Sequence, residues 1–125
     1  PIHAAFNELR RQADVVVVEG VGGFRVPLGP EGGSADLAQT LGMPIILVVG
    51  LRLGCINHAL LTAEAIQSRG LTLTGWVANA IDPHMQKREE NIAALSERIE
   101  SPLLSIMDFQ SQPDASSSAR KLRLP

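Results

Sequence analysis

Aromatic side chains are scarce in this chain: they make up 3% of its 125 residues, and tyrosine is absent. The core must therefore be built from Val, Ile, Leu and Ala, which suits helices packed on a parallel sheet whose strands are covered on both faces. The 45% of hydrophobic and 19% of charged residues are typical of a globular protein. Because the length suffices for one modest core, we predict a single α/β domain over residues 1–125.

Cysteine and long apolar runs are also rare. The only cysteine, Cys55, has no partner for an internal disulfide, which fits a reducing compartment such as the cytoplasm. No apolar run approaches the roughly 20 residues that span a membrane. At a net charge of −2, no Lys/Arg cluster precedes residue 120. We therefore expect a cytoplasmic protein with no membrane and no nucleic-acid partner.

A phosphate-binding loop is missing as well. Such a loop reads G-x-x-x-x-G-K-[ST], with the lysine on the β/γ-phosphates and the hydroxyl on magnesium. The only lysines here are Lys87, in a charged predicted helix, and Lys121, near the end of the chain, and neither follows a glycine. No cluster of His, Cys and Asp has the spacing of metal ligands.

Short apolar stretches alternate with helical patterns along the chain. Aliphatic runs predict strands at Asp14–Glu19, Ile45–Gly50, Thr72–Asn79 and Leu103–Ile106. Periodic apolar residues predict helices at 1–12, 34–41, 55–69 and 84–100, the second of them with Ser34 as its N-cap. This alternation is typical of a parallel sheet with right-handed crossovers. Composition predicts loops at Gly29–Ser34 and Gln110–Ser118 and a loosely ordered tail over residues 110–125.

The most informative segment joins a predicted strand to a glycine loop. Four valines at positions 15–18 are followed by Glu19 and by glycines at 20, 22 and 23. In open α/β sheets ligands bind at the carboxyl ends of the strands. Free backbone N–H groups there can approach a phosphate, and a carboxylate can hold its magnesium. Glu19 can equally be a surface or helix-capping acid, and the glycines can serve a tight turn.

Two further strand ends carry candidate binding residues. Residues 50–58 read Gly-Leu-Arg-Leu-Gly-Cys-Ile-Asn-His and lead into a predicted helix, whose N-terminus favours an anion such as a carboxylate. Arg52 and Asn57 can add hydrogen bonds, although an ordinary strand–helix turn has the same pattern. Asn79 closes the next strand, where its amide can pair with one edge of a base or form a turn before Asp82-Pro83.

Together these segments closely resemble dethiobiotin synthetase. The resemblance rests on Val-Val-Glu-Gly-Val-Gly-Gly at 17–23, Pro27-Leu28, Gly-Cys-Ile-Asn-His-Ala at 54–59 and Gly-Trp-Val-Ala-Asn at 75–79. Their order and intervals also fit that family, and the similarity runs from about Asp14 to Ile106. The Glu-Gly-x-Gly-Gly motif is shared with related P-loop amide-forming enzymes, whereas the two later runs are much more specific.

The resemblance implies a fold and a reaction. The fold is a P-loop NTPase-like three-layer sandwich with a mainly parallel sheet, here incomplete at its N-terminal side, usually in a homodimer. The family uses ATP and Mg²⁺ to form the cyclic urea of dethiobiotin from 7,8-diaminononanoate and CO₂. A carbamate forms on one amine, its oxygen attacks the γ-phosphate, and the second amine closes the ring with loss of phosphate. Such chemistry relies on positioning and charge neutralisation.

The resemblance also implies roles for individual residues. Glu19 matches the magnesium-binding carboxylate, and the following residues, Gly20, Val21 and Gly22, lie along the nucleotide phosphates. Asn79, with Ala80 beside it, matches the residue that reads the adenine. The segment that holds the substrate across the dimer interface corresponds to Gly50, Leu51, Arg52, Gly54, Cys55 and Asn57.

The sequence departs from the family pattern after its last predicted strand. The family usually has a Pro-x-Leu there that packs on the base, and this chain has Met107-Asp108-Phe109 with a spacing one residue shorter. Asp114 would replace the acid expected near the ribose. The family's phosphate loop, catalytic lysine and further magnesium-binding aspartate have no counterpart in these 125 residues, so no catalytic residue is assigned.

The leading hypothesis is therefore the C-terminal part of an ATP-dependent dethiobiotin synthetase, which by itself does not catalyse ring closure. One alternative is a non-catalytic half-length paralogue that binds a partner or a small anion. Another is a related P-loop amide-forming synthetase with a different substrate, against which the Gly-Cys-Ile-Asn-His run argues.

Overall fold

The computed structural model describes residues 1–20, 22–30 and 32–124. The chain divides into two compact units, Pro1–Met43 and Pro44–Pro125, and each is described by itself. The single domain over the whole chain therefore stays a prediction. Within the described residues, no helix combines the length and the apolar character needed to cross a membrane.

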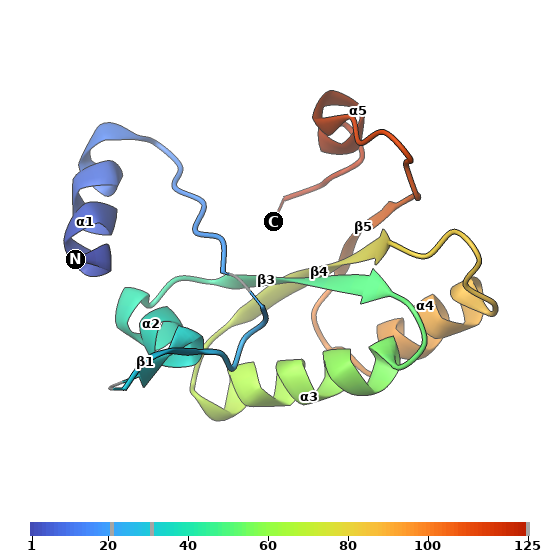
Figure 1. Ribbon diagram of the computed structural model, residues 1–125, viewed down its shortest axis with the longest axis horizontal. Helices are drawn as coiled ribbons and strands as arrows, with labels where there is room; N and C mark the ends of the chain where they lie inside the picture. The colour runs from blue at the N-terminus through green and yellow to red at the C-terminus, as the bar shows by residue number, and fades with distance from the viewer. Residues whose placement is uncertain (21, 31, 125) are drawn as a thin grey trace. The chain divides into compact units, whose positions relative to one another are not determined.

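The first unit contains two helices and a small β-ribbon (Figure 1). The helices α1 (Ile2–Gln12) and α2 (Ser34–Leu41) match their predicted ranges to within one residue. The strands β1 (Pro27–Gly29) and β2 (Gly32–Gly33) pair antiparallel. This ribbon occupies part of the segment predicted as a loop, because the backbone groups of its glycines pair with each other across the turn.

The predicted strand at Asp14–Glu19 is wrong, since none of these residues lies in a strand. Val15 and Val17 leave 74% and 85% of their surface exposed. A strand forms only where a neighbouring strand satisfies its N–H and C=O groups, and no described strand pairs with this segment. Four consecutive valines are typical of a buried strand, but composition alone does not provide a neighbouring strand for hydrogen bonding.

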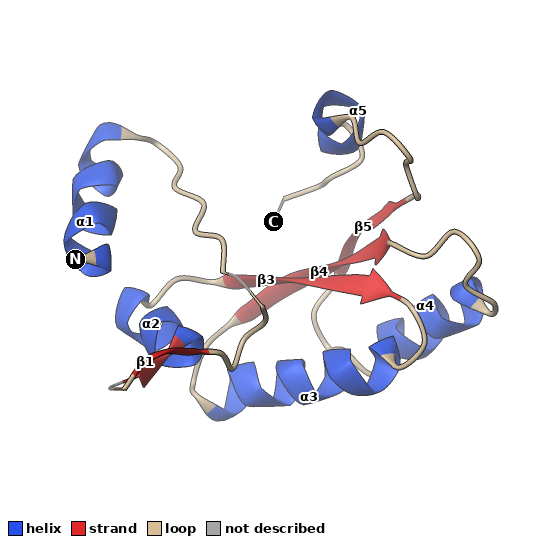
Figure 2. Ribbon diagram, viewed as in Figure 1, coloured by secondary structure: helices blue, strands red, loops and turns tan. Residues whose placement is uncertain are grey.

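The second unit is a parallel sheet with helices against one face. Its strands β3 (Ile45–Leu51), β4 (Leu73–Ala80) and β5 (Leu103–Met107) lie in the order β3-β4-β5 and match the predicted ranges to within one residue. The crossovers are α3 (Cys55–Ser68) and α4 (Arg88–Ser96), and Figure 2 shows both on the same side of the sheet. The predicted α/β class with a parallel sheet is confirmed.

The core of this unit lies between the sheet and α3. Side chains alternate along a strand, so the fully buried Leu51, Trp76 and Ala78 share one face of the sheet. The helix α3 contacts β3 and β4 and buries a stripe at helical spacing: Ala59, Ala63 and Ile66. On the opposite face of β3, Val48 leaves 60% of its surface exposed. Among the described residues, β3 is an edge strand of this sheet.

The helix predicted at 84–100 is shorter in the structure, because α4 spans only Arg88–Ser96. The Asp82 carboxylate accepts a hydrogen bond from the His84 N–H at 2.9 Å, which forms a turn. Lys87 precedes the helix with a φ of 58°, a left-handed conformation that does not continue a helix. Because of these two local features, α4 begins at Arg88 and not at His84, where the sequence pattern predicts its start.

The loop predicted at Gln110–Ser118 contains a short helix, α5 (Ala115–Ala119). Asp114 is its N-cap, and the Asp114 side chain accepts a hydrogen bond from the Ser116 N–H at 3.0 Å. The Asp114 N–H in turn donates to the Gln110 side chain at 2.7 Å. The serine-rich composition predicts a loop, but capping of this kind organises one turn of helix.

Two glycines of the sheet, Gly75 and Gly50, are closely packed against side chains and allow a test of the packing. A Cβ at Gly75 would lie 2.6, 2.7 and 2.8 Å from three side-chain atoms of the buried Leu104. A Cβ at Gly50 would meet the tip of the Ile81 side chain at 2.7 Å, and that side chain is 46% exposed. We expect Gly75→Ala to lower the free energy of unfolding by about 1–3 kcal/mol, because Leu104 has no room to move.

The matched variant Gly50→Ala should cost less than about 1 kcal/mol, because the Ile81 side chain can turn toward solvent. Urea unfolding followed by the fluorescence of Trp76, the only tryptophan, measures both changes. Equal losses in the two variants would contradict the packing described here.

Candidate functional site

The carboxyl ends of the strands bring predicted site segments together. The register pairs Gly50 of β3 with Asn79 of β4, and it pairs Asn79 with Met107 of β5. Adjacent strands lie about 4.8 Å apart, so these residues form a row across the sheet. One residue further along, Leu51 pairs with the buried Ala80. The predicted substrate segment and the predicted base segment thus meet at one edge of the sheet.

A tight turn follows β3 and leads into α3. Leu51 is fully buried, whereas Arg52 is exposed, and the Arg52 carbonyl accepts a hydrogen bond from the Cys55 N–H at 3.0 Å. Gly54 is the N-cap of α3 and has a φ of 88°, a conformation that favours glycine. Asn57 is exposed in the first helical turn. The turn therefore presents Arg52 and Asn57 beside a helix N-terminus, which favours an anion.

The Cys55 side chain points into the protein. Cys55 is 3% exposed, and its Sγ donates to Asn91 Oδ1 in α4 over 3.7 Å. This contact joins the beginnings of α3 and α4. The structure therefore gives the thiol a packing role within the segment predicted to hold the substrate.

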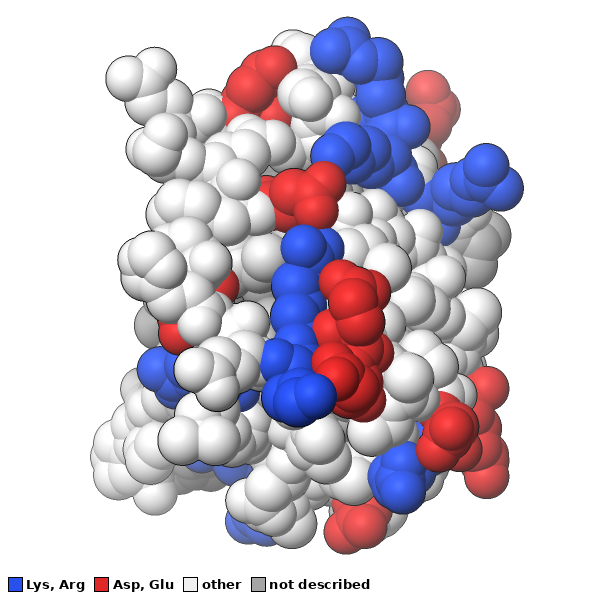
Figure 3. All heavy atoms as spheres, turned by 90° about the vertical axis from the view of Figure 1, so that its right-hand side faces the viewer, with Lys and Arg blue, Asp and Glu red and all other residues white. Residues whose placement is uncertain are grey.

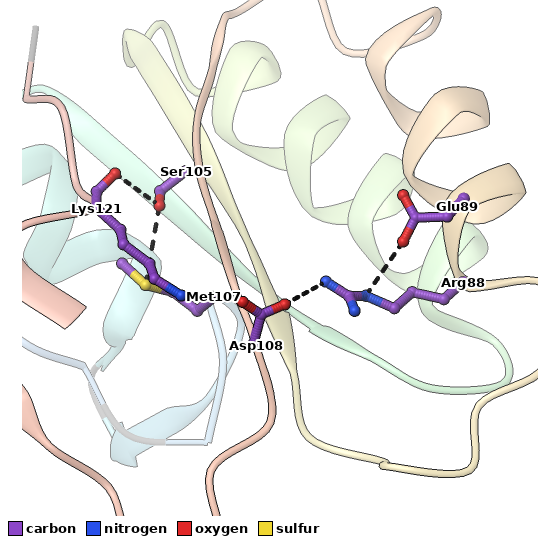
Figure 4. Close-up of polar contacts among 6 residues, drawn as sticks. All are labelled: Arg88, Glu89, Ser105, Met107, Asp108 and Lys121. Carbon is purple, nitrogen blue, oxygen red and sulfur yellow. Dashed lines mark hydrogen bonds and ion pairs between the residues drawn. The ribbon is translucent and has the colours of Figure 1, made fainter. Parts of the chain in front are cut away.

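Asp108, directly after β5, lies between two cations (Figure 4). Its Oδ1 accepts a hydrogen bond from Arg88 Nη2 at 2.9 Å, and its Oδ2 accepts one from Lys121 Nζ at 2.9 Å. On the side of the molecule that is on the right in Figure 1, acidic and basic side chains lie next to one another (Figure 3). The sequence does not reveal this cluster, because its members lie 20 and 13 residues apart with no shared local pattern.

The neighbours of Asp108 in the predicted base segment lie in different surroundings. Met107 is half-buried as the last residue of β5, and Phe109 leaves 45% of its surface exposed. Asp114 caps α5, so its carboxylate already serves a backbone N–H group. The exposed ring of Phe109 is the apolar surface that this segment offers to a flat ligand.

Glu19 and the glycine loop belong to the first unit. Glu19 and Gly20 are exposed, Gly22 has a φ of 78°, and the predicted phosphate contact Val21 lies outside the described residues. Among the residues described, no group of three His, Cys, Asp or Glu side chains could hold a metal ion. Mg²⁺ often takes only one or two carboxylates and completes its shell with water and substrate phosphates. The single Glu19 carboxylate fits one ligand position of such an ion.

Ser34 anchors the glycine loop. Its Oγ accepts a hydrogen bond from the Val26 N–H at 3.0 Å and donates to the Phe24 carbonyl at 2.6 Å. The N-cap of α2 is Gly33, whose N–H donates to Asp36 Oδ2 at 2.7 Å. The predicted N-cap at Ser34 is therefore wrong by one residue. The Ser34 hydroxyl instead bonds to backbone groups of Val26 and Phe24, which lie eight and ten residues earlier in the sequence. Rules for helix capping consider only neighbouring residues, so they do not predict these bonds.

Comparison with known proteins identifies the class. A family described as AAA domain matches residues 2–117, and the chain belongs to that family. Its parallel sheet with helical crossovers agrees with the P-loop NTPase-like fold that the sequence predicts.

Within this class the chain is similar to proteins named ATP-dependent dethiobiotin synthetase. It is 61% identical to the protein of Aromatoleum aromaticum over 124 residues, which cover 99% of this chain and 55% of that relative. It is 52% identical to the protein of a Janthinobacterium species over 121 residues, or 97% of this chain and 51% of the relative. The protein of Nitrosospira multiformis is 52% identical over 114 residues, which cover 91% of this chain and 50% of that relative. The chain spans about half the length of these curated relatives.

Removal of the Ser34 hydroxyl tests its role in the glycine loop. Ser34→Ala deletes the bonds to Val26 and Phe24 and leaves their backbone groups without this partner. We expect amide exchange at Val26 to accelerate about tenfold, which corresponds to about 1.4 kcal/mol. Thr40→Ala is the control, because the Thr40 hydroxyl bonds only to the Asp36 carbonyl of its own helix. Exchange at Val26 that is equally fast in both variants would contradict the anchoring role.

The titration of Asp108 tests the ion-pair cluster. The hydrogen bond from Lys121, followed by that from Arg88, holds the pKa of the Asp108 carboxyl below its ordinary value of 3.8. A lowered pKa means that the ionised form stabilises the fold. This contribution is complete above pH 3.8 and is lost as the pH falls through the lowered pKa.

We expect carbon-detected NMR to show the pKa of Asp108 rising toward its ordinary value in Lys121→Gln. Lys87→Gln should leave this pKa nearly unchanged, because Lys87 pairs with Glu90 at 2.9 Å instead. An unchanged pKa of Asp108 in Lys121→Gln would show that the pair does not persist in solution.

Proposed function

We propose that this chain supplies the base-side and substrate-side parts of an ATP-dependent dethiobiotin synthetase. The reaction forms the cyclic urea of dethiobiotin from 7,8-diaminononanoate, CO₂ and ATP. The observation that carries the proposal is the row Gly50–Asn79–Met107, which joins both predicted binding segments at one sheet edge. The 61% identity to the Aromatoleum aromaticum protein supports the choice of reaction.

In this proposal ATP binds along the carboxyl edges of the strands. The Asn79 amide donates to and accepts from one edge of the adenine. Ala80 and the segment Met107–Phe109 border the base, and Asp114 lies on the ribose side. The family resemblance assigns the glycines Gly20 and Gly22 to the phosphates. Glu19 contributes one carboxylate ligand to Mg²⁺, and the bound ion neutralises negative charge on the phosphate oxygens.

The substrate is held by the turn into α3. The first turn of this helix and the side chains of Arg52 and Asn57 bind the carboxylate of 7,8-diaminononanoate. The enzyme is a homodimer in the cytoplasm, and this turn acts on the substrate across the dimer interface. Gly54 has a φ of 88° and open space where a Cβ would lie, which leaves the start of α3 accessible to the ligand.

These residues bind and orient ATP and 7,8-diaminononanoate, but they do not form a complete catalytic site. Attack of a carbamate oxygen on the γ-phosphate develops charge that cations and backbone N–H groups must stabilise. The sequence has no phosphate-loop motif, and neither Lys87 nor Lys121 follows a glycine. The chain therefore requires a segment with a phosphate loop for turnover.

A complementation assay tests this function. We expect no dethiobiotin from the chain alone with 7,8-diaminononanoate, bicarbonate, ATP and Mg²⁺. Addition of the half of the Aromatoleum aromaticum relative that this chain does not match should restore product formation. In the restored mixture, Glu19→Gln should lower the rate at least about tenfold, because a metal ligand is lost. Glu8→Gln, an exposed acid paired with Arg11, is the control.

Two outcomes would refute the proposal. Turnover by the chain alone at the rate of the intact relative would show that no further segment is needed. A complemented mixture that neither makes dethiobiotin nor binds ATP would show that the chain does not take part in this reaction.

A further inference from the structure

The C-terminal segment, defined here as residues 110–124, is attached to β5 at two adjacent points. The Lys121 carbonyl accepts a hydrogen bond from Ser105 Oγ at 2.9 Å, and the Lys121 ammonium reaches Asp108 Oδ2 at 2.9 Å. Ser105 is 8% exposed, and the first contact, drawn in Figure 4, is partly buried. A single residue thus holds this segment against the strand through its backbone and its side chain.

Arg88 ties the same carboxylate to α4. Its guanidinium donates to Asp108 Oδ1 at 2.9 Å, and its Nε lies 3.6 Å from a Glu89 oxygen. This Nε atom is buried and has no hydrogen-bond partner among the described residues, and the Arg88 side chain is 32% exposed. Loss of Asp108 would therefore leave a partly buried cation with only a long contact to Glu89, which is costly.

We propose that Asp108 is a positioning residue for the nucleotide base. Together with Arg88 and Lys121 it forms a clamp, named here the Asp108 clamp. The clamp joins α4, the end of β5 and the C-terminal segment. The inference rests on the proposed function in one respect, namely that the base binds between Asn79 and residues 107–109. Asp108 acts through its neighbours, because Met107 pairs with Asn79 and Phe109 carries the exposed ring.

The clamp depends on charge and is accessible to solvent. The Asp108 and Lys121 side chains are 57% and 44% exposed. Exposed ion pairs are individually weak and sensitive to salt. Here one carboxylate serves both cations, so neutralisation of Asp108 breaks two pairs at once. The C-terminal segment should therefore open more often in Asp108→Asn and at high salt.

Cleavage by trypsin at Arg120, Lys121 and Arg123 measures this opening in the full chain. When reclosing is faster than cleavage, the cleavage rate follows the population of the open form. We expect Asp108→Asn to raise the rate about two- to fivefold, because it removes the exposed ion pair between Asp108 and Lys121 of this segment. Asp108→Glu, which keeps the charge, should rescue most of this change. Salt of about 0.5 M should accelerate cleavage of the unmodified chain but not of Asp108→Asn.

Glu90→Gln is the matched control, because it removes one carboxylate and one 2.9 Å ion pair that lies within the α4 region. It should leave cleavage at the three C-terminal sites unchanged. Urea unfolding followed by Trp76 fluorescence verifies that each variant is folded. A rate in Asp108→Asn equal to that of the unmodified chain would overturn the proposal.

The role toward the base needs a second measurement. Binding of ATP and of inorganic tripolyphosphate, which has no base, is compared by calorimetry for the same variants in the complemented mixture that tests the proposed function. We expect Asp108→Asn to weaken ATP binding about three- to tenfold and to leave tripolyphosphate binding unchanged. Equal weakening of both ligands would overturn the role toward the base. Faster cleavage in Asp108→Asn together with no ATP binding in the complemented mixture would refute the proposed function and would leave the clamp established.

Discussion

Parallel pairing of β3, β4 and β5 is the constraint on which the second unit depends. Consecutive parallel strands need connections that return along the sheet, and α3 and α4 provide them. The segments that follow the strands therefore start at the same edge. The residues after β3, β4 and β5 are distant in sequence but adjacent there, as the row Gly50–Asn79–Met107 shows. The predicted binding segments come together as a direct result of strand direction.

The same constraint explains the failed strand prediction at Asp14–Glu19. The run in β3 is as apolar as the four valines, but β3 has a partner, β4, that satisfies its backbone groups. The valines have none among the described strands, and three of the four, Val15, Val17 and Val18, remain exposed. A strand is a property of a pair of segments, and one segment alone cannot specify it.

Charge plays a different part at the end of β5. Asp108 is mostly solvated, and its two ion pairs contribute little to the total stability. Their effect is local, because they connect α4, the end of β5 and the segment around α5. Ser34 has a comparable role in the first unit, where one hydroxyl fastens a loop of glycines to α2. In both units a single polar side chain orders the loop beside a candidate binding segment.

The sequence by itself determined α1, α2, α3 and the three paired strands, because their apolar periods and glycine stops are local signals. It also located Glu19, Asn79 and the turn at 50–57 as candidate residues through motif resemblance. Only the tertiary structure decided the start of α4, the use of the Ser34 hydroxyl and the two cations at Asp108. Polar side chains bond to whichever groups packing brings within about 3 Å, and those groups can come from any part of the chain.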